Sequence, residues 1–225
     1  MDDQLYSIIL DVGSKKSNNN FPLKNSTKID GVPFFEKIIE SYCNDCSTIF
    51  VENGFFESLA DLSGIGEKFC VTTETKGALA TAALAVASKV VKEYPIIICP
   101  GDSLVNSEII SDFVKNMIQD NCDAGTVVFT SSDPIYSYVR VNVNGEVVEV
   151  AEKKVIGSLA TAGVFYFKRK SDFLSACRWI FLNNYSFEDN YFIAPVLNYY
   201  VMKNLTVKFY EIKSTEYRRM SGKLI

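Results

Sequence analysis

Apolar residues in the first half of the chain gather in short runs that alternate with segments of helical spacing. Four of these runs predict buried strands: 6–12, 47–52, 96–99 and 124–130. Three segments between them predict helices, because their apolar residues recur every three or four positions or because they are rich in alanine: 33–42, 76–92 and 107–120. This alternation is typical of a parallel sheet covered by crossover helices.

The pattern changes in the second half of the chain. Segments 136–143 and 146–152 alternate around Asn144-Gly145, which predicts a β-hairpin. Further strands are predicted at 162–167 and 206–212, and helices at 172–183 and 191–203. We find no linker or repeat, so we expect one α/β domain over 1–225. Its central sheet should be mixed, mostly parallel and flanked by helices, with the hairpin as an insertion.

Composition and charge narrow the class of protein. The 225 residues are 48% hydrophobic and 22% charged, which is ordinary for a globular chain. A net charge of −4 without a basic block argues against a nucleic-acid partner. We expect no membrane partner, because no apolar run approaches the roughly 18 residues of a membrane span. Asp2 and Asp3 stand where a secretory signal carries basic residues, so we expect a cytoplasmic protein.

The chain contains no histidine, which excludes Ser-His-Asp and Cys-His catalysis and every metal site with a histidine ligand. The six cysteines are scattered, and we interpret them as free thiols in a reducing compartment. Any catalysis must therefore use carboxylates, lysines, backbone amides and a cation with oxygen ligands, such as Mg²⁺.

Two loops are candidates for a ligand site, because ligands of open parallel sheets bind beyond the carboxyl ends of the strands. Asp102 follows a buried strand in Pro100-Gly101-Asp102 and is a candidate Mg²⁺ ligand; the alternative is an ordinary turn or capping aspartate. Gly13 opens a polar loop with Lys15 and Lys16, which could surround phosphates; the alternative is a simple surface loop.

The order of several short motifs resembles the nucleotidyltransferase family of sugar-1-phosphate pyrophosphorylases, and most closely its capsule and surface-polysaccharide branch. The motifs span nearly the whole chain: FPLK at 21–24, IDGVP at 29–33, KGALATA at 76–82, PGD at 100–102, YSYV at 136–139, AEK at 151–153, ATAGVFYF at 160–167 and YFIAP at 191–195. The resemblance implies the nucleotide-diphospho-sugar transferase fold, which is GT-A-like.

The resemblance also implies an activity. Members transfer a nucleotidyl group from a nucleoside triphosphate to a sugar phosphate or similar phosphorylated acceptor, releasing pyrophosphate, with Mg²⁺ as cofactor. By resemblance, Lys24 would neutralise the triphosphate, Asp102 would hold Mg²⁺ and Gly77 would admit the base. Glu152 and Lys153 would bind the acceptor. The remaining residues of the implied substrate-binding set are Gly13, Lys15, Lys16, Thr72, Ser137, Gly163 and Asp189. A homo-oligomer is compatible with the resemblance.

The sequence departs from the family pattern at two places. Lys15 and Ser17 stand at or near positions where the family has a glycine and an arginine, and no aspartate follows Asp189 to serve as a second metal ligand. One alternative is therefore a degenerate homologue that binds a nucleotide or sugar phosphate without turnover. Another is a glycosyltransferase on the related fold, although Ser103 and Leu104 after Asp102 do not form the usual Asp-x-Asp motif.

Overall fold

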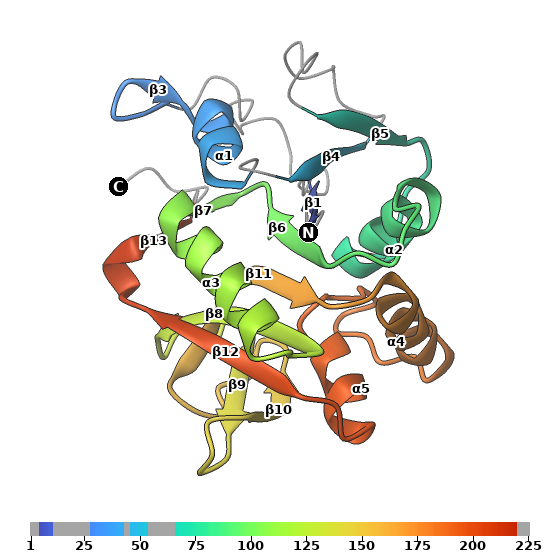
Figure 1. The fold of residues 1–225 in the computed structure, drawn as a ribbon, viewed down its shortest axis with the longest axis vertical. Helices are drawn as coiled ribbons and strands as arrows, with labels where there is room; N and C mark the ends of the chain where they lie inside the picture. Colours follow the sequence, from blue (N-terminus) through green and yellow to red (C-terminus); the bar gives the residue numbers. More distant parts are fainter. Residues whose placement is uncertain (1–4, 11–27, 43–45, 54–65, 220–225) are drawn as a thin grey trace.

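The computed structural model describes residues 5–10, 28–42, 46–53 and 66–219, and one mixed sheet runs through its centre (Figure 1). Seven strands follow one another across this sheet, in the order β10 (Val147–Ala151), β9 (Tyr138–Val141), β11 (Leu159–Phe167), β6 (Ile96–Pro100), β1 (Tyr6–Leu10), β4 (Ser47–Asn53) and β5 (Glu67–Val71). β8 (Ala124–Thr130) pairs with β11, and β12 (Val207–Ile212) pairs with β8. The strands β6, β1, β4 and β5 are parallel, whereas β11 runs antiparallel to β6, β8 and β9. The predicted fold class is confirmed.

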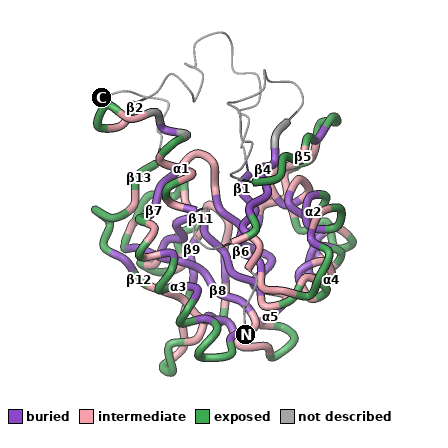
Figure 2. The backbone as a smooth tube through the Cα atoms, turned by 45° about the horizontal axis from the view of Figure 1, so that its top comes forward, coloured by how far each residue is buried: buried purple, intermediate pink, exposed green. Residues whose placement is uncertain are grey.

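Helices cover both faces of the sheet and enclose two hydrophobic clusters (Figure 2). One face carries α2 (Ala78–Lys89), α4 (Lys170–Leu182) and α5 (Val196–Met202). The other carries α1 (Phe34–Tyr42) and α3 (Ser107–Gln119). The strands β6 and β8 contribute buried side chains to both clusters, which explains why their sequences are continuously apolar.

Local signals account for where α3 begins and which side of it is buried. The side chain of Asn106 accepts a hydrogen bond of 2.9 Å from the amide of Glu108, which caps the helix. The buried residues follow helical spacing and point to the sheet: Ile110, Phe113, Val114 and Met117. This helix agrees with the predicted segment 107–120 to within one residue.

Two short ladders lie outside the main sheet. β7 (Ser103–Val105) pairs antiparallel with β13 (Tyr217–Arg219), which follows a 3₁₀ turn, η1 (Ser214–Glu216). β2 (Lys28–Ile29) pairs with β3 (Val32–Pro33). The hydroxyl of Tyr42 donates a hydrogen bond of 2.9 Å to the carbonyl of Ser103, so α1 is anchored to β7. Because β7 follows β6 after a short turn, its partner β13, the last described strand, also lies beyond the end of β6.

Most predicted elements are confirmed, including the hairpin around Asn144 and Gly145, where Gly145 has φ 75°. The helix predicted over 191–203 is shorter and begins only at Val196. Its expected first turn is not helical, because the backbone of Tyr191 is engaged with residues at the start of α2. Five described strands were not predicted from the sequence: β2, β3, β5, β7 and β13.

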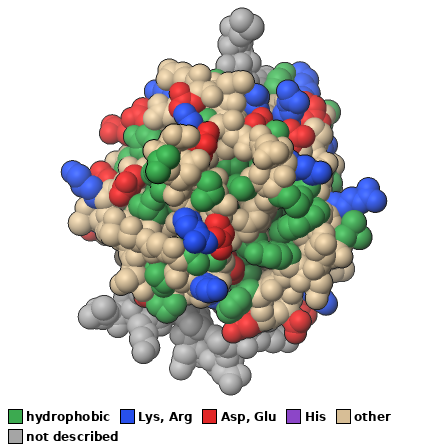
Figure 3. Space-filling model, turned by 90° about the horizontal axis from the view of Figure 1, so that it is seen from below, with side chains coloured by type: hydrophobic (Ala, Val, Ile, Leu, Met, Phe, Trp, Pro, Cys, Tyr) green, Lys and Arg blue, Asp and Glu red, His purple; other side chains and the backbone are tan. Residues whose placement is uncertain are grey.

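The surface seen in Figure 3 mixes acidic, basic and apolar side chains, which agrees with the small net charge of −4. Among the described helices, none has the length and apolar character needed to cross a bilayer.

Candidate functional site

The carboxyl ends of β1 and β6 lie side by side, as expected for parallel strands that carry adjacent loops. Leu10 pairs with Pro100, and the amide of Gly101 donates a hydrogen bond of 2.7 Å to the carbonyl of Leu10. Four predicted site residues of the first loop lie outside the described residues: Gly13, Lys15, Lys16 and Lys24. The described strand that leads to this loop thus ends beside the turn that carries Asp102.

Asp102 lies between β6 and β7, and its side chain is 27% exposed. Arg219 of β13 approaches it, with Nε 3.9 Å from Oδ2. Within the described ranges, no group of three or more Asp, Glu or Cys side chains comes together. Because Mg²⁺ in nucleotide sites commonly takes one or two carboxylates and completes its shell with phosphate oxygens and water, a single accessible carboxylate fits a cation shared with a ligand. The metal role of Asp102 stays a prediction.

Gly163 lies beside the same turn. β11 runs antiparallel to β6, and Phe165 pairs with Ile98, which brings Gly163 next to Pro100. The glycine has φ +80°, and a Cβ atom there would lie 3.3 Å from Cγ of Pro100. A side chain at this position would be strained and crowded, so the missing side chain makes room for Pro100 at the end of β6.

Ser137 and Glu152 join the start of β9 to the end of β10. The hydroxyl of Ser137 donates a hydrogen bond to Oε2 of Glu152, and the carbonyl of Ser137 accepts one of 2.8 Å from the amide of Thr161 in β11. Burial raises the pKa of Glu152, although the Ser137 hydrogen bond and the nearby Lys153 each act to lower it. The result is a partly buried carboxyl group that Ser137 orients.

Lys153 follows Glu152 in a left-handed backbone conformation, with φ 49°. Its ammonium nitrogen lies 5.2 Å from the ring centre of Phe187 and 5.0 Å from that of Phe192. Both distances are in the range of cation–π attraction, so the two rings hold the lysine head. Sequence reasoning assigned neither phenylalanine a contact with Lys153, although Phe192 belongs to the YFIAP motif, because the contact joins segments far apart in the chain.

Gly77 is the N-cap residue of α2 and has φ 92°. A Cβ atom at Gly77 would lie 2.5 Å from the carbonyl oxygen of Tyr191. The amide of Tyr191 donates to the carbonyl of Lys76 at 2.9 Å, and its carbonyl accepts from the amide of Leu79 at 3.1 Å. The missing side chain thus makes room for the backbone of Tyr191. Admission of a base at Gly77 remains a prediction.

The last two predicted residues lie at exposed turns. Thr72 follows the final residue of β5. Asp189 has φ 60° and belongs to a turn closed by two hydrogen bonds, of 2.9 and 3.0 Å, between Phe187 and Asn190. Asp189 therefore shares one segment with the phenylalanines that contact Lys153. This segment, 187–192, connects the start of α2 with Lys153.

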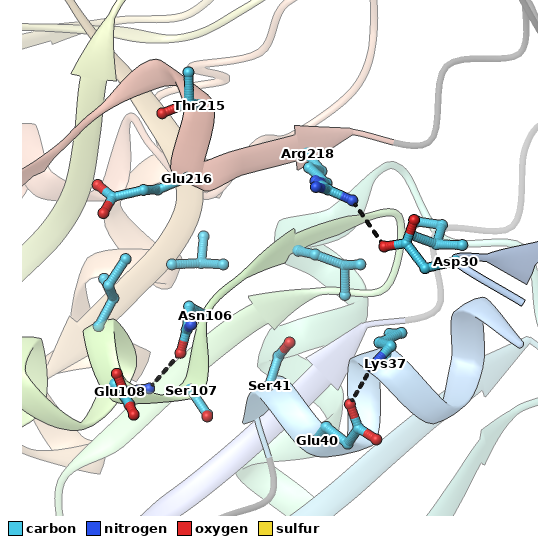
Figure 4. Close-up of a pocket in the computed structure, with 14 residues that line it drawn as sticks. Asp30, Lys37, Glu40, Ser41, Asn106, Ser107, Glu108, Thr215, Glu216 and Arg218 are labelled. Carbon is cyan, nitrogen blue, oxygen red and sulfur yellow. Dashed lines mark hydrogen bonds and ion pairs between the residues drawn. The ribbon is translucent and has the colours of Figure 1, made fainter. Parts of the chain in front are cut away.

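A cavity of about 510 Å³ lies apart from these residues, between α1, the start of α3 and β13 (Figure 4). Its charged lining side chains include two ion pairs: Arg218 with Asp30 at 3.4 Å, and Lys37 with Glu40 at 2.8 Å. None of the predicted site residues within the described ranges lines this cavity. Of the predicted residues, Asp102 and Gly163 lie at the end of β6, and Ser137, Glu152 and Lys153 lie at the start of β9 and the end of β10.

The chain matches no protein-family model, and no curated protein sequence matches it. Solved structures do resemble it. A nucleoside-diphosphate-sugar pyrophosphorylase from Vibrio cholerae has a TM-score of 0.75 and 21% identity, over 96% of this chain and 95% of that one.

Two further structures match at lower identity. A CMP:2-keto-3-deoxy-manno-octonic acid synthetase complexed with CTP has a TM-score of 0.65 and 14% identity, over 94% and 90% of the two chains. An inositol-1-phosphate CTP transferase from T. maritima has a TM-score of 0.63 and 18% identity, over 94% and 87%. The chain thus has the nucleotide-diphospho-sugar transferase fold found in these nucleotidyltransferases.

Proposed function

We propose that this protein is a nucleotidyltransferase that transfers a nucleotidyl group from a nucleoside triphosphate to a sugar phosphate or a similar phosphorylated acceptor. An oxygen of the acceptor phosphate attacks the α-phosphorus, the bond from that phosphorus to the β-phosphate bridge breaks, and pyrophosphate leaves. The attacking oxygen is already anionic, so no general base is required. The resemblance of the second-half motifs supports a role in making precursors for capsule or surface polysaccharide.

The observation that carries this proposal is a series of neighbouring groups along one edge of the sheet. Gly163 lies against Pro100 beside Asp102, and Thr161 of the same strand contacts Ser137. Ser137 in turn donates to Glu152, which precedes Lys153. A candidate metal ligand, a carboxyl group and an ammonium group therefore lie on segments that β11 connects. Such a set suits a ligand that has both phosphate and hydroxyl groups.

Each group has a distinct proposed task. Glu152 would accept hydrogen bonds from acceptor hydroxyls, because Ser137 already fixes the orientation of its carboxyl group. Lys153 would bind the acceptor phosphate with an ammonium group held by two rings. Asp102 would hold Mg²⁺, which when bound supplies positive charge to the triphosphate. The work of the site would be positioning and charge neutralisation.

The test is release of pyrophosphate by the full-length protein in Mg²⁺. A panel of the common nucleoside triphosphates is combined with sugar 1-phosphates and with other phosphorylated acceptors, and each pair is compared with the triphosphate alone. We expect acceptor-dependent release with one favoured base, and loss of that release in Asp102→Asn. No acceptor-dependent release with any pair would contradict the proposal.

One specific observation favours a second candidate, a ligand-binding homologue without turnover. Within the described part of the chain, the cation Arg219 approaches Asp102, whereas the resemblance implies that many family members have a second metal aspartate there. Thermal shift separates the candidates, since a ligand that binds only the folded state raises the melting temperature. Stabilisation by triphosphate and acceptor together, without release of pyrophosphate, would identify the binding protein.

A further inference from the structure

The short strand β13 brings a second charged group to the end of β6. β13 pairs antiparallel with β7, so that Arg219 stands opposite Ser103, the residue after Asp102. Its Nε lies 3.9 Å from Oδ2 of Asp102, which is an ion pair too long for a hydrogen bond. The Arg219 side chain is 41% exposed, so part of this five-donor guanidinium side chain is accessible from solvent.

The alternation of side chains along β13 fixes which way each residue faces. Tyr217 and Arg219 share one side of the strand, and Arg218 lies on the other. The ring of Tyr217 stacks on Phe129, with 4.5 Å between ring centres. Arg218 points to Asp30 at the edge of the separate cavity, with Nη1 3.4 Å from the carboxylate (Figure 4). The two adjacent arginine side chains therefore lie in different surroundings, Arg219 beside Asp102 and Arg218 beside Asp30.

Among the described residues, Asp102 forms an ion pair with Arg219, and two phenols lie on the same side. Tyr136 and Tyr217 are the phenols on its side, and their rings are 5.9 Å apart. Burial raises the pKa of Tyr217 to about 12 and also raises that of Tyr136, so both are neutral near pH 7. Asp102 is the carboxylate paired with Arg219, and a bound cation would compete for it.

We propose that Arg219 is a phosphate-binding residue that grips the triphosphate, or the departing pyrophosphate, beside Asp102. A guanidinium matches phosphate oxygens with two parallel hydrogen bonds, which a lysine does not. A triphosphate carries several negative charges, and the first loop has Ser17 near the position where the family has arginine. Arg219 would supply a guanidinium from β13. The inference rests on the proposed function, because it names a ligand contact of the same site.

Inorganic tripolyphosphate with Mg²⁺ is the probe, because it has the phosphate chain without base or ribose. Its dissociation constant is measured by calorimetry on the full-length protein and on Arg219→Gln, with Arg218→Gln as the matched control. We expect Arg219→Gln to weaken binding about tenfold or more. Arg218→Gln should stay within about twofold, since both side chains are exposed but face different ways. Arg219→Lys should recover part of the loss.

Each outcome decides the question. If Arg219 only neutralised Asp102, its removal would free the carboxylate for the cation, and tripolyphosphate with Mg²⁺ would bind equally well or better. Equal weakening in both glutamine variants, or no tripolyphosphate binding by the unmodified protein, also overturns the inference. Acceptor-dependent release of pyrophosphate is scored separately. If the unmodified protein releases pyrophosphate but Arg219→Gln binds tripolyphosphate as tightly as it does, the inference about Arg219 is wrong and the proposed activity stands. If Arg219→Gln binds tripolyphosphate more weakly but no acceptor releases pyrophosphate, the proposed activity is wrong and the phosphate contact stands.

Discussion

The charged groups at the ends of β6 and β10 lie in different surroundings. Around Lys153, which we call the acceptor side, the ammonium lies on two rings and the neighbouring Glu152 is fixed by Ser137. Around Asp102, which we call the phosphate side, the two opposite charges are 3.9 Å apart and their side chains are 27% and 41% exposed.

This contrast indicates two ways of preparing a site for an anionic ligand. Groups that are held before binding lose little conformational freedom when the ligand arrives, which favours selectivity on the acceptor side. On the phosphate side, Asp102 and Arg219 are partly exposed and far apart for an ion pair. They gain strong contacts only when a polyanion binds Arg219 and its cation binds Asp102. We therefore expect substitutions on the acceptor side to change structure and binding together, and those on the phosphate side to change mainly binding.

The largest expected effect is on folding stability, at the contact between Gly77 and Tyr191 in the segment that contacts Lys153. Gly77→Ala places a methyl group 2.5 Å from the carbonyl oxygen of Tyr191, at φ 92°. Backbone strain costs about 1–2 kcal/mol, and the steric overlap should raise the total loss of folding free energy to about 3 kcal/mol or more. Urea unfolding measures the loss.

The control for this substitution is Gly145→Ala. Gly145 has φ +75°, but a Cβ atom there meets nothing within 4 Å. Its replacement should cost only the backbone strain, about 1–2 kcal/mol. If both variants lose the same folding free energy, the backbone at Tyr191 moves away from the added methyl group at little cost. Segment 187–192 would then not hold Lys153 in a fixed position relative to α2.

The second prediction concerns the charge of Lys153 itself. Lys153→Met keeps an apolar stem against Phe187 and Phe192 but removes the ammonium group. We expect the KM for the phosphorylated acceptor to rise about 30-fold, the equivalent of about 2 kcal/mol for a charged hydrogen bond. The KM for the triphosphate should change little. Lys154→Met, at the exposed neighbouring position, is the control and should leave both constants unchanged.

The third prediction uses the raised pKa of Glu152. The folded protein holds this proton at a higher pH than the unfolded chain does, whose pKa is near 4.5. Folding stability therefore falls as pH rises from about 4.5 through the folded pKa, with a slope of at most about 1.4 kcal/mol per pH unit. Glu152→Gln lacks this contribution, so its stability relative to the unmodified protein should increase over that window. A constant difference from pH 4.5 to 7 would show that Glu152 does not titrate in this way.

Much of this architecture follows from local sequence. Continuous apolar runs identified β6 and β8, and Asn144-Gly145 identified the hairpin, because these signals depend on neighbouring residues alone. The position of Asp102 at the sheet edge also followed, since it comes directly after a buried strand. The strand β5 was missed because it lies at the sheet edge and several of its side chains are exposed, which removes the apolar pattern.

The remaining features depend on contacts between distant segments. Nothing local in Tyr217-Arg218-Arg219 indicates that it pairs with β7, so its arginine could not be assigned to Asp102 beforehand. The contacts of Lys153 with Phe187 and Phe192 are of the same kind. The first loop, with Lys15, Lys24 and their predicted roles, lies outside the described residues, and those roles stay predictions.

The smallest expected effect tests whether the rings position Lys153 or only pack beside it. Phe187→Leu keeps an apolar side chain but removes one ring face, 5.2 Å from the ammonium nitrogen. A cation–π contact at a partly exposed site is worth about 0.5–1 kcal/mol, so the KM for the acceptor should rise about two- to fivefold with kcat unchanged. The decisive measurement is a double-mutant cycle with Lys153→Met. If the ring acts through the ammonium, Phe187→Leu has no further effect on acceptor KM once the ammonium is gone. An equal effect in both backgrounds would mean that Phe187 shapes the acceptor side independently of Lys153, and that the contrast with the phosphate side lies in packing and not in a preset charge.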